Sequence, residues 1–273
     1  MKNTQGISRL DVLLVERGLI ESRERAKAIV MSGSVYVNGI KATRAAMKVS
    51  DDAKIDVKSG IPYVSRGGFK LQRALEVFDI TVTDKVCLDC GASTGGFTDC
   101  LLQNGAKLVY AVDVGYGQLS WNLRNNPHVV VMERTNIRYV TPEMFDLKPE
   151  LITIDLSFIS LSLILPCIKE ILACKGDVIS LIKPQFEAGR EKVGKKGVVR
   201  DPEVHKDVLN SFIEYADKAG FALRSLTHSP IKGPEGNVEF LAHLDLSGAG
   251  RNIDINTEDI VETAHDALRD LER

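Results

Sequence analysis

The stretch VCLDCGASTGGFTDCLL, residues 86–102, decides the fold. An apolar run ends at Asp89, a glycine-rich turn follows, and a helix is expected to begin near Phe97. The turn contains Gly91, Ser93, Gly95 and Gly96. Glycines let the backbone approach a ligand closely, and the helix N-terminus behind such a turn favours polar or anionic groups. The stretch lacks the G-x-G-x-x-G of dinucleotide sites and the G-K-[ST] of phosphate loops, so it predicts a ligand-binding turn of another kind.

On the C-terminal side of this turn, apolar strands alternate with helices. Strands are expected at 86–89, 108–114, 129–132, 151–156 and 177–184, and helices near 96–104, 117–124, 161–173 and 202–219. Such alternation predicts an α/β fold with a doubly wound, Rossmann-like parallel sheet. Two later strands, within 222–231 and 237–246, have no helix between them, so we expect an antiparallel pair at the C-terminal end of the sheet.

On the N-terminal side, residues 8–59 resemble a small α+β unit. Gly18 ends one expected helix, Ser22 begins a second, and Asn38-Gly39 predicts a turn between short strands. We therefore expect four parts in the chain. They are a small domain over 1–60, a linker over 61–66, a larger domain over 67–250 and a polar helical tail over 251–273.

Composition limits the classes of protein that this chain can belong to. It has 273 residues, 44% of them hydrophobic and 26% charged, which is typical of a globular protein. We found neither a signal peptide nor an uncharged apolar run long enough to span a membrane, and the five cysteines do not suggest a disulfide framework. A cytoplasmic protein with no membrane partner is expected. Residues 1–62 carry a net charge of +4 and the remainder −6, which favours a polyanion-binding N-terminal part.

Asp113 ends the second strand of the expected sheet, in the sequence AVDVGYGQ. It follows the glycine-rich turn by about 20 residues, the separation at which an acidic side chain accepts hydrogen bonds from ribose hydroxyls. Taken alone, an aspartate at a strand end is often only a turn residue. The turn and Asp113 together favour a site for a nucleoside.

Three sets of motifs in the chain resemble those of known families. GASTGGFTD with Asp113 resembles the FtsJ-like family of S-adenosylmethionine-dependent ribose 2′-O-methyltransferases. RLDVLLVERGL and SRERAKAIVMSGSVYVNG resemble a small RNA-binding domain named after a small-subunit ribosomal protein. The two domains in this order, joined at VSRGGFKL, resemble the TlyA or "hemolysin A" family of rRNA methyltransferases. The resemblance implies S-adenosylmethionine as cofactor and ribosomal RNA or ribosomal subunits as partner.

The resemblance also implies a catalytic tetrad. By motif it falls on Lys70 (GGFKL), Asp155 (TIDLS), Lys183 (LIKPQFE) and Glu239 (NVEFL). Asp155 and Lys183 each end an apolar strand, where open α/β sheets bind ligands. Lys183 is the implied general base or orienter of the hydroxyl, and the two carboxylates would position the lysines. A lysine accepts a proton only if its pKa is lowered, and burial or a second cation acts in that direction.

Further residues complete the expected sites. The candidate cofactor-binding residues are Asp89, Gly91, Ser93, Thr94, Gly95, Gly96, Phe97, Asp113, Thr135 and Asn136. The candidate RNA-binding residues are Arg9, Arg17, Arg23, Arg25, Lys27 and Lys41. The basic loop over 183–200 suggests a lip over the substrate, or simply a solvated loop. Phe158 is expected either to flank the methyl group or a flipped base, or to pack in the core. No metal site is expected.

Two other functions remain open at this level. The family's name suggests a pore-forming haemolysin, and a non-catalytic ribosome-assembly factor would have the same domains. The lack of a spanning segment weighs against the first, and the complete tetrad weighs against the second. The sequence does not indicate the modified nucleotide, the ribosomal subunit or the oligomeric state.

Overall fold

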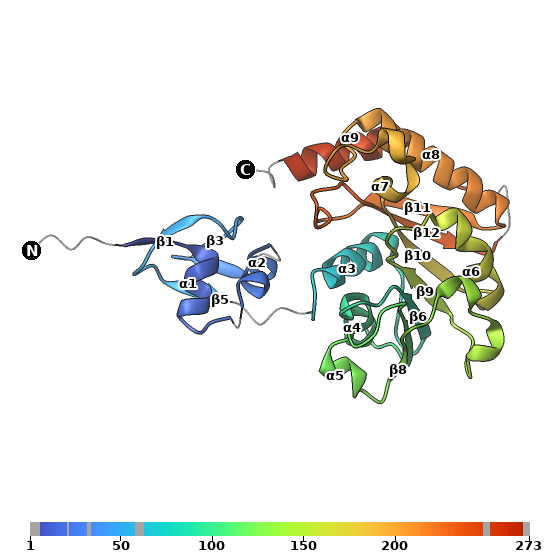
Figure 1. Ribbon diagram of the computed structural model, residues 1–273, viewed down its shortest axis with the longest axis horizontal. Helices are drawn as coiled ribbons and strands as arrows, with labels where there is room; N and C mark the ends of the chain where they lie inside the picture. The colour runs from blue at the N-terminus through green and yellow to red at the C-terminus, as the bar shows by residue number, and fades with distance from the viewer. Residues whose placement is uncertain (1–5, 21, 32–33, 58–62, 248–251, 270–273) are drawn as a thin grey trace, which may run out of the picture. The chain divides into compact units, whose positions relative to one another are not determined.

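A computed structural model describes residues 6–20, 22–31, 34–57, 63–247 and 252–269 (Figure 1). The chain divides into two compact units, Met1–Arg66 and Gly67–Arg273.

The smaller unit packs two helices against short antiparallel strands. Its elements are β1 (Ile7–Arg9), α1 (Leu10–Glu16), α2 (Arg23–Met31), β2 (Val35–Val37), β3 (Ile40–Lys41), β4 (Lys48–Ser50) and β5 (Ile55–Val57). Strand β1 pairs with β4, and β2 lies between β3 and β5. Leu10, Leu14 and Ile29 are fully buried in its core. Asn38 and Gly39 join β2 to β3 with positive φ values of 51° and 79°, as a tight hairpin turn with matching twist requires.

The larger unit is built on a seven-stranded sheet of order β11-β12-β10-β9-β6-β7-β8. The strands are β6 (Val86–Cys90), β7 (Leu108–Val112), β8 (Val129–Met132), β9 (Leu151–Ile154), β10 (Asp177–Ile182), β11 (Ala222–His228) and β12 (Phe240–Asp245). The first five are parallel, and β12 is antiparallel to both β10 and β11. The expected α/β sheet with an antiparallel C-terminal pair is confirmed.

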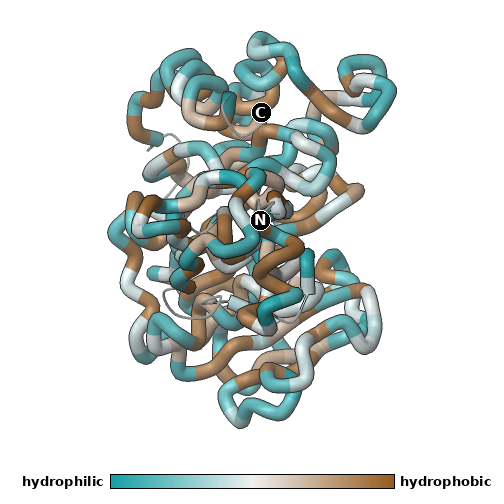
Figure 2. Tube along the Cα trace, turned by 90° about the vertical axis from the view of Figure 1, so that its left-hand side faces the viewer, coloured by the Kyte–Doolittle hydropathy of each residue, from teal (hydrophilic) through white to brown (hydrophobic). Residues whose placement is uncertain are grey.

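Helices cover this sheet. They are α3 (Gly67–Phe78), α4 (Gly96–Gln103), α5 (Trp121–Arg124), α6 (Leu165–Ile171), α7 (Pro184–Glu187), α8 (Pro202–Lys218) and α9 (Thr257–Arg269). Helix α4 packs on β6 and β7, while α8 and α9 pack together and on β11 (Figure 1). Hydrophobic and hydrophilic stretches alternate along the chain, and hydrophilic residues are frequent at the outer bends of the trace (Figure 2). Within the described ranges, no helix is both long and apolar enough to cross a membrane.

Several element boundaries differ from the expected ones. The helix expected at 117–124 is only α5, because Gly117 has a φ of +72° and keeps the preceding chain in a turn. The helix expected at 161–173 divides into a 3₁₀ turn and α6, whose first turn contains Pro166, a residue suited to a helix start.

Glu239 lies outside the strand in which it was expected, one residue before β12 begins. A turn closed by the Gly233 amide on the Asn237 carbonyl oxygen delays the start of the ladder. The C-terminal tail is amphipathic rather than merely polar, because α9 buries Val261, Ala264 and Leu268 against the core of the sheet.

Candidate active site

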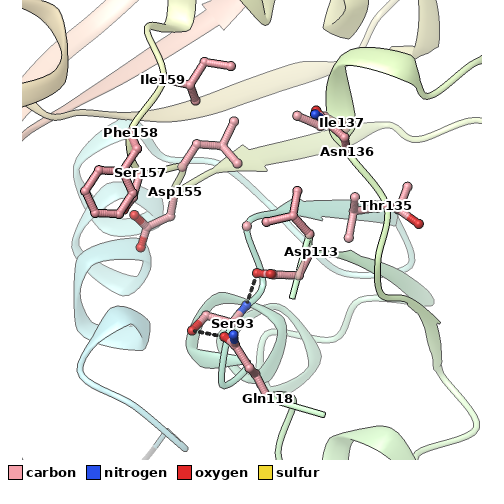
Figure 3. A pocket seen from close by; sticks show the side chains of 14 residues that line it. Ser93, Asp113, Gln118, Thr135, Asn136, Ile137, Asp155, Ser157, Phe158 and Ile159 are labelled. Atoms are coloured by element: carbon pink, nitrogen blue, oxygen red, sulfur yellow. Dashed lines mark hydrogen bonds between the residues drawn. The ribbon is translucent and has the colours of Figure 1, made fainter. Parts of the chain in front are cut away.

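A cavity of about 430 Å³ lies at the carboxyl ends of the parallel strands. Strand β6 has β7 on one side and β9 on the other, so the winding of the sheet reverses here, where open α/β sheets bind ligands. Residues that follow β6, β7, β8 and β9 line the cavity (Figure 3). Strands β7, β9 and β10 end two residues earlier than expected. The residues that follow β7 and β9 therefore leave the ladder and turn toward the cavity.

Gly91 makes the close approach of β6 to β9 possible. Its φ is +88°, a conformation that side chains rarely adopt. A Cβ atom at this position would lie 2.5 Å from the carbonyl oxygen of Asp155. Any other residue would therefore push apart the two strand ends that form the floor of the cavity.

The Asp113 carboxylate is held in place by backbone amides. Its Oδ2 accepts from the Ser93 amide at 2.8 Å, and its Oδ1 accepts from the Gly115 amide at 2.7 Å. Each carboxylate oxygen has lone pairs beyond the one used, so an oriented Asp113 can also accept from a ligand's hydroxyls. Gln118 lies beside it, within 3.4 Å of the Ser93 hydroxyl (Figure 3). Gln118 was missed in the sequence, although it lies in the AVDVGYGQ segment that contains Asp113.

The segment after β8 forms another wall. The Thr135 amide donates to the Asp113 carbonyl oxygen at 2.9 Å, which ties this segment to the end of β7. The Asn136 side chain accepts from the Arg138 amide and starts a 3₁₀ turn. Ile137 presents an apolar surface to the same cavity, so this wall offers both polar and apolar groups.

The structure brings together part of the expected cofactor set. Five members line the cavity: Gly91, Ser93, Asp113, Thr135 and Asn136. Thr94, Gly95, Gly96 and Phe97 do not line it. Thr94 and Gly95, whose φ is +98°, lie in the turn before α4, and Gly96 and Phe97 are the first residues of that helix. The sequence did not single out the apolar residues Val112, Val114, Ile137, Leu156 and Ile159, which also line it. Their apolar character is equally expected of core residues.

Asp89 is also absent from the cavity lining. It is fully buried, and its Oδ2 accepts from both the amide and the hydroxyl of Thr98 in α4, at 2.9 and 2.7 Å. Burial raises the pKa of Asp89 to about 7, while the Thr98 hydrogen bonds oppose that rise. Its contacts fasten β6 to α4. Cys87 and Cys90 beside it are buried free cysteines.

Lys183 and Asp155 meet at the edge of the cavity. The Lys183 Nζ lies 2.6 Å from Asp155 Oδ1 and 3.0 Å from the Ser157 hydroxyl oxygen. Asp155 and Ser157 both line the cavity, whereas Lys183 reaches it from the end of β10. A cation is therefore fixed between two oxygens at the edge of this cavity.

Glu239 and Lys70 form a second ion pair. Lys70 Nζ lies 2.5 Å from Glu239 Oε2, and the two residues are 7% and 1% exposed. Ile182 of β10 pairs with Phe240 of β12, so Lys183 and Glu239 each lie one position beyond the same ladder pair. The register thus brings the expected catalytic residues of β9, β10 and β12 to one end of the sheet, and the ion pair brings Lys70 of α3 to Glu239.

Phe158 follows Asp155 and Ser157 on the cavity wall and is 90% exposed. Its φ of +65° is rare for an aromatic residue, and its ring lies 5.0 Å from that of Phe186. Core packing, one of the two interpretations of Phe158, is thus wrong.

Glu187, which was missed in the sequence, supports the segment after Phe158. Glu187 accepts from the Leu161 amide at 2.8 Å and from the Ser160 hydroxyl at 2.7 Å, and the Tyr215 hydroxyl donates to it at 3.2 Å. Burial raises the pKa of Glu187. The KPQFE motif was the available signal for this residue.

In the smaller unit, several candidate RNA-binding side chains have intramolecular partners. Arg9 and Arg23 both bind the buried Asp11, and these contacts lower the Asp11 pKa to about 2. Arg17 donates to two backbone carbonyl oxygens. Lys27 and Lys41 are exposed. Arg25 lies in α2, but its side chain falls outside the described part. Arg9 and Arg23 remain half exposed beside Asp11.

Comparisons with known proteins give matches to both units. The FtsJ-like methyltransferase family matches residues 63–246, and the S4 domain matches residues 8–55. The chain is 53% identical to "Putative rRNA methyltransferase YqxC" of Bacillus subtilis, over 96% of this chain and 95% of that one. It is 45% identical to "16S/23S rRNA (cytidine-2'-O)-methyltransferase TlyA" of Mycobacterium tuberculosis, over 87% and 89%. A solved structure, "Putative hemolysin from Streptococcus thermophilus", is 45% identical, with a TM-score of 0.76 over 98% of this chain and 99% of that one.

Proposed function

This chain belongs to the FtsJ-like methyltransferase family, and we propose that it transfers a methyl group from S-adenosylmethionine to a ribose 2′-hydroxyl of ribosomal RNA. The Mycobacterium tuberculosis relative is named for that reaction on cytidine in 16S and 23S rRNA. The observation that carries the proposal is the Lys183–Asp155 ion pair, which lies at the edge of a cavity of nucleoside size.

The residues of the cavity fit the cofactor. Asp113 supplies an oriented carboxylate for the ribose hydroxyls, and Thr135, Asn136 and Ile137 supply polar and apolar contacts for the adenine. At Gly91 and Ser93 the backbone lines the cavity, where it can contact the methionine part of S-adenosylmethionine. Asp89 is assigned a structural role and not a cofactor contact. Bound in this cavity, S-adenosylmethionine would supply an electrophilic methyl group.

We assign to Lys183 the task of binding and orienting the 2′-hydroxyl of the target ribose. Its Nζ is held by Asp155 and Ser157, so it is fixed in position before any substrate arrives. From there its ammonium group orients the 2′-oxygen and stabilises the negative charge that develops on it. To take up the hydroxyl proton instead, Lys183 must first release one of its own protons to solvent. Orientation by fixed groups lowers the entropic part of the barrier, and a positioned base adds about 10²–10⁴-fold.

Glu239 and Lys70 act next to Lys183. Glu239 is nine-tenths or more buried and bonded to Lys70, so it presents a fixed negative charge at the register position opposite Lys183. We assign Glu239 and Lys70 the task of positioning the Lys183 side chain. Phe158, exposed beside the cavity, presents a ring face on which the target base can stack.

The smaller unit is assigned to RNA binding. It matches the S4 domain, and residues 1–62 carry a net charge of +4. The exposed Lys27 and Lys41, together with the outer faces of Arg9 and Arg23, are the proposed phosphate contacts. The loop over 183–200, with six Lys and Arg against two Glu, adds positive charge beside Lys183. Ribosomal subunits as partners imply that the protein acts in the cytoplasm.

The test is a labelling experiment. The full-length protein is incubated with tritiated S-adenosylmethionine and purified small or large ribosomal subunits, and the labelled nucleotide is mapped. We expect label on a ribose 2′-oxygen of rRNA. Label on a base, on protein, or on no component of either subunit would contradict the proposal.

A further inference from the structure

A second cavity of about 590 Å³ lies in the larger unit. Its lining includes four basic side chains: Arg200, Lys232, His265 and Arg269. Among the residues that the structure describes, none that lines the cavity is an aspartate or a glutamate, although the part of the chain after residue 62 carries a net charge of −6. Basic residues are thus concentrated at this cavity, although the part of the chain that contains it has a negative net charge.

This cavity is distinct from the one that contains Asp113, because the two share no lining residue. His265 and Arg269 come from α9, which lies beyond the segment matched by the FtsJ-like family, residues 63–246. The segment matched by the family therefore supplies only one wall of the cavity, and α9 supplies the other. Its volume lies within the range of about 300–1,000 Å³ that is usual for small-molecule sites.

Buried hydrogen bonds fix the cavity wall. Asn237, which is 1% exposed, accepts from the Val199 amide at 2.9 Å and donates to the Gly197 carbonyl oxygen at 2.9 Å. These bonds hold the segment that contains Arg200 against the segment that contains Lys232 and Gly236. The positions of two of the four basic residues are therefore determined by a buried side chain.

A histidine pair connects the same wall to α9. His205, fully buried, has Nε2 3.2 Å from the Val199 carbonyl oxygen and Nδ1 2.9 Å from His265 Nε2. A carbonyl oxygen only accepts, so Nε2 of His205 carries the hydrogen, and His265 Nε2 donates to Nδ1. Burial and the neighbouring His265 lower the His205 pKa to about 4, so His205 is neutral at pH 7. This contact fixes the His265 ring where it lines the cavity.

From this geometry we propose that the cavity binds a phosphate group. Arg200 and Arg269 offer planar sets of N–H donors, and Lys232 offers an ammonium group. His265 gives its Nε2 hydrogen to His205, so in its neutral form it lines the cavity without offering a donor. Guanidinium groups bind phosphate oxygens in pairs of parallel hydrogen bonds, and such charge-assisted bonds are roughly twice as strong as neutral ones. Arg269 also donates to Asp266 at 2.6 Å, which orients its guanidinium without placing a carboxylate on the cavity wall.

The phosphate has two sources with the same chemistry: a free phosphorylated metabolite, or the backbone of the RNA. The second rests on the proposed function and the first does not. The loop that contains Lys232 also packs on the candidate active site, because a Cβ at Gly233 would lie 2.5 Å from Glu239 Oε1. A bound phosphate would therefore restrain a loop that touches Glu239.

The experiment uses the full-length protein and inorganic pyrophosphate, titrated by calorimetry in about 50 mM chloride. The variant is the double substitution Arg200→Gln/Arg269→Gln, chosen because both side chains are exposed and their loss leaves no buried gap. Lys218→Gln is the matched control, since Lys218 is 78% exposed on α8 and outside the cavity. Lys232→Gln is a second cavity variant, and the melting temperature of each protein is compared with that of wild type.

We expect saturable, one-to-one binding of pyrophosphate that weakens at least tenfold in the double variant and stays within twofold in Lys218→Gln. A wild-type protein that does not bind pyrophosphate, or cavity variants that bind as well as wild type, would overturn the proposal. A second arm measures rRNA affinity against salt concentration. If the slope of log affinity against log salt concentration falls by about two in the double variant, the site binds RNA phosphates. If that slope is unchanged, the site binds a free phosphorylated ligand. The pyrophosphate arm does not depend on methyl transfer, so failure of the proposed function is separable from failure of the site.

Discussion

Lys70 and Glu239 are 169 residues apart in the chain, yet Lys70 Nζ lies 2.5 Å from Glu239 Oε2 in a buried position. The pair connects α3, at the start of the larger unit, to the turn before β12. Breaking a buried pair by removing one partner leaves an uncompensated charge, which costs about 3–5 kcal/mol.

We expect Glu239→Gln to lower the free energy of unfolding by up to that amount and to slow methyl transfer. The double variant Lys70→Met/Glu239→Gln should recover much of the stability, because no buried charge then lacks a partner, but it should not recover activity. Urea unfolding and single-turnover methylation measure the two effects. Recovery of activity together with stability would show that the pair only stabilises the fold.

Lys183→Ala should leave cofactor affinity near that of wild type and reduce the single-turnover rate by about 10²–10⁴-fold, the contribution of a positioned base. Cofactor affinity should be unchanged because Lys183 lies at the edge of the cavity and does not line it. Lys218→Ala, on the exposed face of α8, is the control and should keep its rate. A Lys183→Ala rate within a few-fold of wild type would remove Lys183 from the mechanism.

Asp113→Ala should weaken S-adenosylmethionine binding about ten- to a hundredfold, because hydrogen bonds to a charged acceptor contribute about 1.5–3 kcal/mol. Calorimetry with the full-length protein measures the change. Asp113→Asn keeps the size of the side chain, but its NH2 group faces one of the two backbone amides from which Asp113 accepts, so we expect a loss comparable to that of Asp113→Ala. Unchanged affinity in Asp113→Ala would exclude the ribose contact.

The pH dependence of stability should report on Asp89. Its folded-state pKa, about 7, lies above the ordinary value of 3.8, so its contribution is fully present below about pH 4 and is lost as pH rises toward 7. Within that window each pH unit costs about 1.4 kcal/mol, and above pH 7 the loss levels off. Asp89→Asn cannot ionise. Its unfolding free energy, measured from pH 4.5 to 8, should therefore rise relative to wild type up to about pH 7; a constant difference would contradict the assignment.

Removal of residues 1–62 should leave a folded protein that still binds S-adenosylmethionine. Every residue that lines the first cavity lies between Gly91 and Ile159, and the described core of the larger unit contains no residue of the smaller one. Methylation of rRNA should be lost, because the basic unit is removed and phosphate contacts dominate the affinity of RNA-binding proteins. Full methylation of intact subunits at moderate salt by the shortened chain would contradict a two-part function.

The local sequence determined which segments of this protein form strands and helices. The strand–turn–helix at 86–102 and the alternation after it gave the sheet, because a period-two or period-3.6 apolar pattern already selects the element. The relation between the glycine-rich turn and Asp113 could also be predicted from the sequence. The two follow strands that are consecutive in the chain and adjacent in the sheet. The tetrad residues were identified by family resemblance, and no spacing in the chain relates Lys70 to Glu239.

Only the tertiary structure decided which way these side chains face and what they bind. Asp89 ends the same apolar strand as the glycine turn, but it faces α4, because Thr98 offers it two donors inside the core. Arg9 and Arg23, both expected to contact RNA, also bind the buried Asp11. The pairing of Lys70 with Glu239 and of Lys183 with Asp155 depends on strand order and register. Contacts between distant segments are fixed by which surfaces are buried together, and local periodicity carries no information about that.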